Sequence, residues 1–202
     1  MLSLPKATEL SRALPKKAIY AKFDMNTAAR ERFDAEISRI TIVHEISPQT
    51  TAIAAGTQVQ SVFVFHVLLK REAYSEKVIA QLSKLIPQHI LFVLQYGDEC
   101  RLAVRYTAAL LQSEWQTVDA ASVTLEGLDL DAVWEHIVMQ VGDIRIEGGN
   151  TLVQQIETNA RRAQLQKELE RIQKQLRQEK QPRRKYDLMV EERKIKEKLK
   201  IS

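Results

Sequence analysis

The sequence predicts an α/β (α+β) protein, in which a mixed β-sheet domain with flanking helices is followed by a C-terminal helical coiled-coil hairpin. Two observations predict this fold. The run from Val59 to Leu69 is rich in β-branched and aromatic residues, as expected of a central strand buried on both faces. After Asn150 the composition changes, and Pro182 separates two long helical stretches. We therefore expect a globular domain over 1–147 and a basic helical appendage over 150–202.

Each expected element of the globular domain has a local signal. Asn26 or Thr27, Ser75 and Asp129 are favourable helix N-caps, and Pro87 should end the helix that Ser75 begins. The expected elements, in order, are two helical turns over 7–13, a helix to about residue 37, a strand over 39–46, a loop or short edge strand over 48–56, a strand over 59–69, a helix over 75–87, strands over 89–94 and 101–106 joined by a turn at 97–98, a strand over 115–124 and a helix after residue 129.

The charge is divided unevenly along the chain. Residues 151–202 carry 15 Lys and Arg against 8 Asp and Glu, whereas residues 1–150 carry 15 against 18. The basic appendage therefore favours an acidic partner or a nucleic acid. The single cysteine, Cys100, excludes an internal disulfide framework, and no run approaches the roughly 20 apolar residues of a membrane span. We expect a cytoplasmic protein with no membrane segment.

Seven apolar residues form a seam along the two appendage helices. Those of the first helix step by four, three and four residues, as in a coiled coil, and those of the second helix share one face. The seam consists of Leu165, Leu169, Ile172, Leu176, Leu188, Ile195 and Leu199. Packed antiparallel, the helices would form a hairpin that turns through residues 181–185. Because Glu192 interrupts the seam, we expect a partner, a second copy or the globular domain to cover it.

Four cations gather where the hairpin should turn. Lys180, Arg183, Arg184 and Lys185 would be exposed in a small volume, which favours contacts with phosphates or with an acidic protein surface. A run of solvated charges with no partner is the alternative. Tyr186 is the only aromatic residue nearby, so the pattern does not indicate stacking of single-stranded bases.

The sequence contains no clear catalytic constellation. The expected order helix–strand–strand–strand–helix–strand is similar to the core of metal-dependent, restriction-type nucleases, which need paired carboxylates and a nearby lysine. The central strand has His66 where that pattern needs an acid, and Glu45 and Lys70 are the nearest usable groups. The four histidines show no metal-ligand spacing. We therefore predict no catalytic residues, no metal and no cofactor, and keep a divergent nuclease as an alternative.

Short phrases spread over nearly the whole chain resemble an uncharacterised bacterial family, domain of unknown function 4391. These phrases are Leu4-Pro5-Lys6-Ala7-Thr8, Leu14-Pro15-Lys16 with Tyr20, Val62-Phe63-Val64-Phe65, Ile86-Pro87, Gln178-Glu179-Lys180-Gln181 and Arg184-Lys185. Pro182 and Arg183 depart from the usual tail phrase of the family. The resemblance implies a bacterial protein whose gene lies beside helicase or methyltransferase genes in mobile or phage-defence loci. It implies no activity and no catalytic residue.

The expected function follows from the basic appendage and this resemblance together. We expect a non-catalytic accessory or adaptor protein of a DNA-processing or phage-defence system. Its hairpin would dock onto a helicase-like or methyltransferase partner, or onto DNA or RNA. The alternatives are the divergent nuclease and a coiled-coil homodimer with a structural role.

Overall fold

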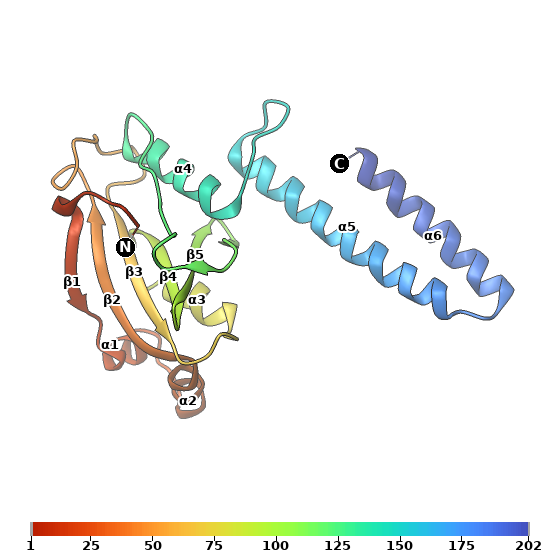
Figure 1. Ribbon diagram of the computed structural model, residues 1–202, viewed down its shortest axis with the longest axis horizontal. Coiled ribbons are helices and arrows are strands. Elements are labelled where there is room, and N and C mark those ends of the chain that lie inside the picture. Colours follow the sequence, from red (N-terminus) through yellow and green to blue (C-terminus); the bar gives the residue numbers. More distant parts are fainter. Residues whose placement is uncertain (1, 202) are drawn as a thin grey trace. The chain divides into compact units, whose positions relative to one another are not determined.

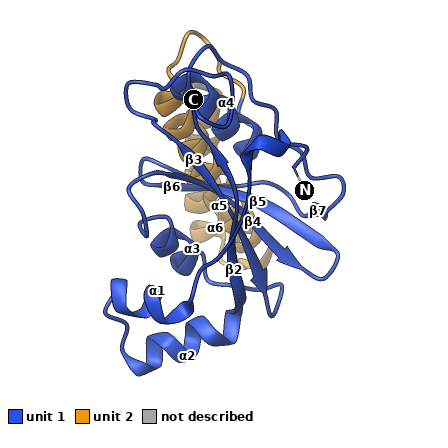
Figure 2. Ribbon diagram, turned by 90° about the vertical axis from the view of Figure 1, so that its left-hand side faces the viewer, with its two compact units in different colours: residues 1–144 blue, residues 145–202 orange. Residues whose placement is uncertain are grey.

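The computed structural model describes residues 2–201 and divides the chain into two compact units, with the boundary along the chain between Ile144 and Arg145. The larger unit is a mixed sheet with flanking helices, and the smaller unit ends in two long helices (Figures 1 and 2). The predicted fold class is therefore confirmed.

One sheet organises the larger unit. Its strands are β1 (Glu9–Ala13), β2 (Ile37–Ile46), β3 (Val62–Leu69), β4 (His89–Tyr96), β5 (Glu99–Tyr106), β6 (Ala109–Gln112) and β7 (Gln116–Thr117). The strands β1 to β6 lie in sequence order, and β7 pairs with β5. Only β3 and β4 run parallel, because a helical crossover joins them; the other pairs are antiparallel. The strand β3 is central, as predicted.

The helices begin where the sequence supplies caps. The helical elements are η1 (Lys6–Thr8), α1 (Lys16–Lys22), α2 (Thr27–Glu36), α3 (Glu76–Leu82), α4 (Leu130–Gly142), α5 (Leu152–Gln178) and α6 (Pro182–Ile201). The side chains of Asn26 and Asp129 accept hydrogen bonds from backbone N–H groups in the first turns of α2 and α4. Both predicted caps are confirmed. At α3, Ser75 occupies the N-cap without a side-chain bond, and the helix ends at Leu82, before Pro87.

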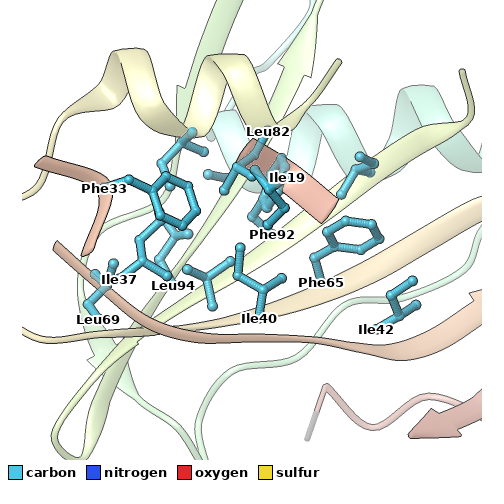
Figure 3. Packing of buried hydrophobic residues seen from close by; sticks show 14 of the residues in the cluster. Ile19, Phe33, Ile37, Ile40, Ile42, Phe65, Leu69, Leu82, Phe92 and Leu94 are labelled. Carbon is cyan, nitrogen blue, oxygen red and sulfur yellow. The ribbon is translucent and has the colours of Figure 1, made fainter. Parts of the chain in front are cut away.

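The main core of the larger unit lies between the sheet and the helices α1, α2 and α3. Ile19, Phe33 and Leu82 pack from the helices onto Phe65 and Phe92 of the central strands (Figure 3). The rings of Phe65 and Phe92 meet edge to face, with centroids 5.9 Å apart. The helix α4 instead packs against β5 and β6. Burial of these apolar side chains is the main stabilising contribution to the unit.

The N-terminal segment differs from its prediction, because residues 9–13 form the edge strand β1 rather than helical turns. The strand pairs with β2 through Glu9 opposite His44 and Ala13 opposite Thr41. Every residue of β1 is exposed, so the segment has no apolar alternation that would have identified a strand. Hydrogen bonding to β2 therefore decides its conformation.

Residues 48–56, predicted as a loop or a short edge strand, form a loop with one isolated bridge, from Ala54 to Asp129. The strand predicted over 115–124 was wrong in its extent. Within 115–124 only β7 is a strand, while β6 was missed. Tyr106 pairs with Ala109, so β5 and β6 are joined by a tight turn in which Thr107 has a φ of 52°. That turn contains no glycine, asparagine or aspartate, so the usual hairpin signal is missing.

Candidate functional site

The predicted seam residues pack against one another between α5 and α6. Leu165, Leu169, Ile172 and Ile195 are buried, and the other three members of the seam are half-buried against them. The two helices run antiparallel as a hairpin (Figure 1). The apolar seam is thus filled within one chain. A coiled-coil homodimer that used these residues would have to open the hairpin.

Glu192, which interrupts the seam, is held by polar partners. Gln173 on α5 donates a hydrogen bond of 2.9 Å to Glu192, and Lys196 lies 2.6 Å from the same carboxylate. The bonds from Lys196 and then Gln173 lower the pKa of Glu192. Glu192 therefore forms a polar contact between the two helices, and no partner is needed to fill its place in the seam.

The turn of the hairpin lies earlier than predicted, in the three residues between Gln178 and Pro182. Pro182 is the first residue of α6, where its missing N–H and fixed φ fit the start of a helix. Glu179 organises the turn, since its carboxylate accepts hydrogen bonds from the backbone N–H groups of Lys180 and Gln181. The same carboxylate lies 3.5 Å from Arg184.

The four predicted cations form a basic tip on this hairpin, which we define as Lys180, Arg183, Arg184 and Lys185. Lys180 lies in the turn, and the other three lie in the first turn of α6. All four are exposed, and this first turn contains no acidic residue. Arg184 pairs with Glu179, but within residues 2–201 no carboxylate forms an ion pair with Arg183 or Lys185.

The position of the basic tip is unfavourable for the helix that carries it. The first turn of a helix is the positive end of the helix dipole, where acidic residues stabilise and cations destabilise by roughly 0.3–1 kcal/mol each. The three cations in that turn therefore oppose the helix dipole, and of these three only Arg184 has an ion-pair partner among the described residues, Glu179. Local features that oppose stability are expected at functional sites.

A pocket of about 290 Å³ in the larger unit was missed by sequence reasoning. Its lining residues come from the loop before β3, from the ends of β4 and β5 and from α4; they are Thr57, Gln58, Val59, His89, Tyr106, Asp131, Trp134 and Glu135. Asp131 is the most engaged group. Its carboxylate accepts bonds from the backbone N–H groups of Thr57, Gln58 and Val59, and from the Thr57 hydroxyl at 2.7 Å.

These hydrogen bonds stabilise the ionised form of the Asp131 carboxylate. The Thr57 hydroxyl first, and then the backbone N–H groups, lower the pKa of Asp131 to about 2. Gly56 stands beside this contact, and a Cβ at that position would collide with the carboxylate. Asp131 therefore ties the loop to the start of α4. No sequence signal marks this role, because the partners lie more than 70 positions away along the chain.

The remaining groups of the pocket do not form an acid–base or nucleophilic pair. The ring of His89 stands edge-on to Trp134 with centroids 4.8 Å apart, and burial lowers the pKa of His89, which keeps the imidazole neutral. Burial, followed by the charge of Glu135, raises the pKa of the Tyr106 phenol. Since both Asp131 oxygens are occupied by the loop, we interpret this region as structural.

Neither the element order nor the Glu45 and Lys70 pair that suggested a nuclease is found in the structure. Because 48–56 contains no strand, the chain passes through two strands between α2 and α3, and not through the three that the nuclease core requires. Glu45 pairs with Phe63 near one end of β3, whereas Lys70 follows the other end. At about 3.3 Å per residue the two lie roughly 20 Å apart, too far to serve one metal ion. Across the described part of the chain, no three His, Cys, Asp or Glu residues are grouped so that they could hold a metal.

Buried His44 and half-buried His66 have structural partners. His66 Nε2 lies 2.6 Å from Gln95 Oε1 on the neighbouring strand, so its partner is a side-chain amide. His44 shares a hydrogen bond of 2.9 Å with the Thr8 hydroxyl, which ties η1 to β2. Burial lowers the pKa of both imidazoles and favours their neutral forms.

Comparison with known proteins gives a family and no activity. The family model described as "Domain of unknown function (DUF4391)" matches residues 2–199, nearly the whole chain. No curated protein and no solved structure matches the chain. Among the described residues, no helix is both long and apolar enough to cross a membrane.

Proposed function

We infer that this chain, which belongs to the DUF4391 family, is a non-catalytic accessory protein whose basic tip contacts the phosphates of DNA or RNA. The proposed setting is a bacterial DNA-processing or phage-defence system, in which a helicase-like or methyltransferase protein acts on the same nucleic acid. The larger unit serves as the rigid body of the adaptor, and the hairpin is its docking arm.

The observation that carries this proposal is the placement of exposed cations at the tip. Arg183 and Lys185 have no ion-pair partner within residues 2–201 and stand at the positive end of α6. A phosphate would be attracted both by the side chains and by the field of the helix end. Lys180 lies beside them in the turn. Together the three cations can reach neighbouring phosphates of one backbone.

The charge of the two units supports the same conclusion. Residues 145–202 carry 16 Lys and Arg against 9 Asp and Glu, while residues 1–144 carry 14 against 17. A polyanion would therefore approach the hairpin in preference to the larger unit. Binding to phosphates releases condensed counterions, so affinity should fall steeply with salt, with a slope close to −0.9 per neutralised phosphate on duplex DNA.

The test is a fluorescence-anisotropy titration of labelled duplex and single-stranded DNA and RNA at several salt concentrations. The variant Arg183→Glu/Lys185→Glu should bind each nucleic acid at least about tenfold more weakly at low salt. Its salt slope on duplex DNA should be shallower by roughly two units, as expected for two lost phosphate contacts. Arg184 is left unchanged because it pairs with Glu179.

The matched control is Lys167→Glu/Lys194→Glu, which makes the same change of charge at exposed positions away from the tip. The control should lose much less affinity than the tip variant. An equal loss would mean that charge spread over the hairpin, and not the tip, attracts nucleic acid. Absence of salt-sensitive binding by the wild-type protein would overturn the proposal and favour direct docking onto a helicase-like protein. Cleavage of the DNA only with Mg²⁺ would revive the nuclease alternative.

A further inference from the structure

A second surface of α6 is not used by the fold. Tyr186, Met189 and Val190 expose 67%, 53% and 38% of their surface, although α6 already buries its own seam. The three residues are spaced i, i+3 and i+4, so they lie on one face within little more than a turn. We name these three residues the outer strip.

The outer strip faces away from the seam of the hairpin. With 3.6 residues per turn, Tyr186 and Val190 lie about 160° from Leu188, and Ile195 lies on the same inner side as Leu188. The burial pattern agrees, because Ile195 is 4% exposed whereas the strip residues are exposed. Tyr186 and Val190 therefore lie outside the packing of α5 on α6, and Met189, about 100° from Leu188, lies on the flank beside them.

The composition of the outer strip is typical of a protein interface. Tyrosine, methionine and arginine are enriched at the centres of such interfaces, and aromatic anchors supply much of the binding energy. Arg183 precedes the strip by one turn, and Arg193 follows it by one turn. Surfaces that bind nucleic acid are more polar than protein–protein interfaces, so this row of apolar side chains is better suited to binding a protein.

The positive charge of α6 indicates which kind of protein could bind the outer strip. The helix α6 carries 8 Lys and Arg against 4 Asp and Glu. A second copy docked through its own α6 would bring the same excess of positive charge against this one, and like charges across an interface are unfavourable. A partner with an apolar groove rimmed by Asp and Glu would match both the strip and its basic flanks.

We propose that the outer strip of α6 is a docking site for an acidic protein partner, which receives Tyr186, Met189 and Val190 in an apolar groove. The helix would lie in the groove with its i, i+3 and i+4 residues as anchors, and Arg193, one turn after the last anchor, would meet the acidic rim. This inference extends the proposed function, since the hairpin would hold nucleic acid at its tip and a protein along its outer face.

The first experiment uses synthetic amphipathic helical peptides as probes for the full-length protein. One peptide has an apolar face with Glu and Asp rims, a second has the same face with Lys and Arg rims, and a third has the acidic composition in scrambled order. Anisotropy titrations should show binding of the acidic amphipathic peptide at least about tenfold tighter than of the other two. Equal binding of the acidic and scrambled peptides would overturn the proposal, because charge alone would then explain it.

The variant Tyr186→Ala/Met189→Ala/Val190→Ala removes the anchors and keeps residues that favour a helix. It should weaken binding of the acidic amphipathic peptide by about tenfold or more, the scale of one or two interface anchors. The control Glu191→Ala/Lys194→Ala changes exposed neighbours without altering net charge and should leave that affinity within about twofold. Equal losses in the two variants would contradict a role for the strip.

Two measurements separate this inference from its competitors. Light scattering should show the same mass for the wild type and the strip variant; a wild-type dimer that the strip variant abolishes would make the strip a self-association surface. The strip variant should also retain wild-type affinity for DNA and RNA, whereas the tip variant Arg183→Glu/Lys185→Glu should lose it. Loss of nucleic-acid binding in the strip variant would assign the strip to the phosphate-binding surface instead.

Discussion

Polar side chains of the larger unit and the exposed cations at the tip of the hairpin have opposite roles. In the larger unit, Asp131, His44 and His66 are bonded to neighbouring elements and hold the fold together. On the hairpin, Arg183, Lys185 and the outer strip have no such role. This difference supports our proposal that the hairpin carries the recognition surfaces.

The largest expected effect concerns the core of the larger unit. Replacing Phe92 with alanine should destabilise that unit by about 3–5 kcal/mol, because it removes a fully buried ring and its contact with Phe65. Urea unfolding followed by tryptophan fluorescence reports this unit alone, since Trp115 and Trp134 both lie in it. Leu128, which is 95% exposed, is the control, and Leu128→Ala should change stability by less than about 0.5 kcal/mol.

The next largest effect is expected in the hairpin and tests whether the hairpin unfolds independently of the sheet. Ile172 is fully buried in the seam, so Ile172→Ala should destabilise the α5–α6 pair by about 2–5 kcal/mol. Hydrogen exchange should then accelerate at the amides of α5 and α6 and remain unchanged in β3 and β4. Equal acceleration in the sheet would show that the two units unfold together. The exposed Lys174→Ala provides the baseline.

A smaller, local effect is expected at Asp131. Because its folded pKa is lowered to about 2 from an ordinary value of 3.8, its stabilising contribution is present above about pH 4 and is lost as the pH falls toward 2. Asp131→Asn should raise the exchange rates of the Thr57, Gln58 and Val59 amides at neutral pH. The free energy of unfolding of the variant should also fall less steeply as the pH is lowered from about 4 toward 2. An unchanged pH dependence would show that this carboxylate does not tie down the loop.

The smallest effect has the opposite sign from the others. Arg183→Glu/Lys185→Glu places acids at the positive end of α6, so the hairpin should gain roughly 0.5–2 kcal/mol while nucleic-acid binding falls. Thermal unfolding followed by far-UV circular dichroism, at low salt, would detect the gain. A less stable variant would mean that the wild-type cations support the fold, and that their position at the start of α6 is not unfavourable.

Local patterns predicted much of this molecule because they depend on neighbouring residues. Asn26 and Asp129 mark helix starts by capping chemistry, and the β-branched run of β3 identifies a central strand. The seam residues of α5 and α6 likewise follow from helical periodicity. The family resemblance is confirmed over residues 2–199.

Sequence by itself thus determined the fold class, the main helices and strands, the pairing surfaces of α5 and α6 and the location of the exposed cations. Only the tertiary structure decided that residues 9–13 pair as an edge strand, that Asp131 ties down a loop more than 70 residues away and that Tyr186, Met189 and Val190 remain uncovered. The physical reason is the range of the interactions. Caps and periodicity act within a few residues, whereas strand pairing and burial depend on partners that folding brings together from distant parts of the chain.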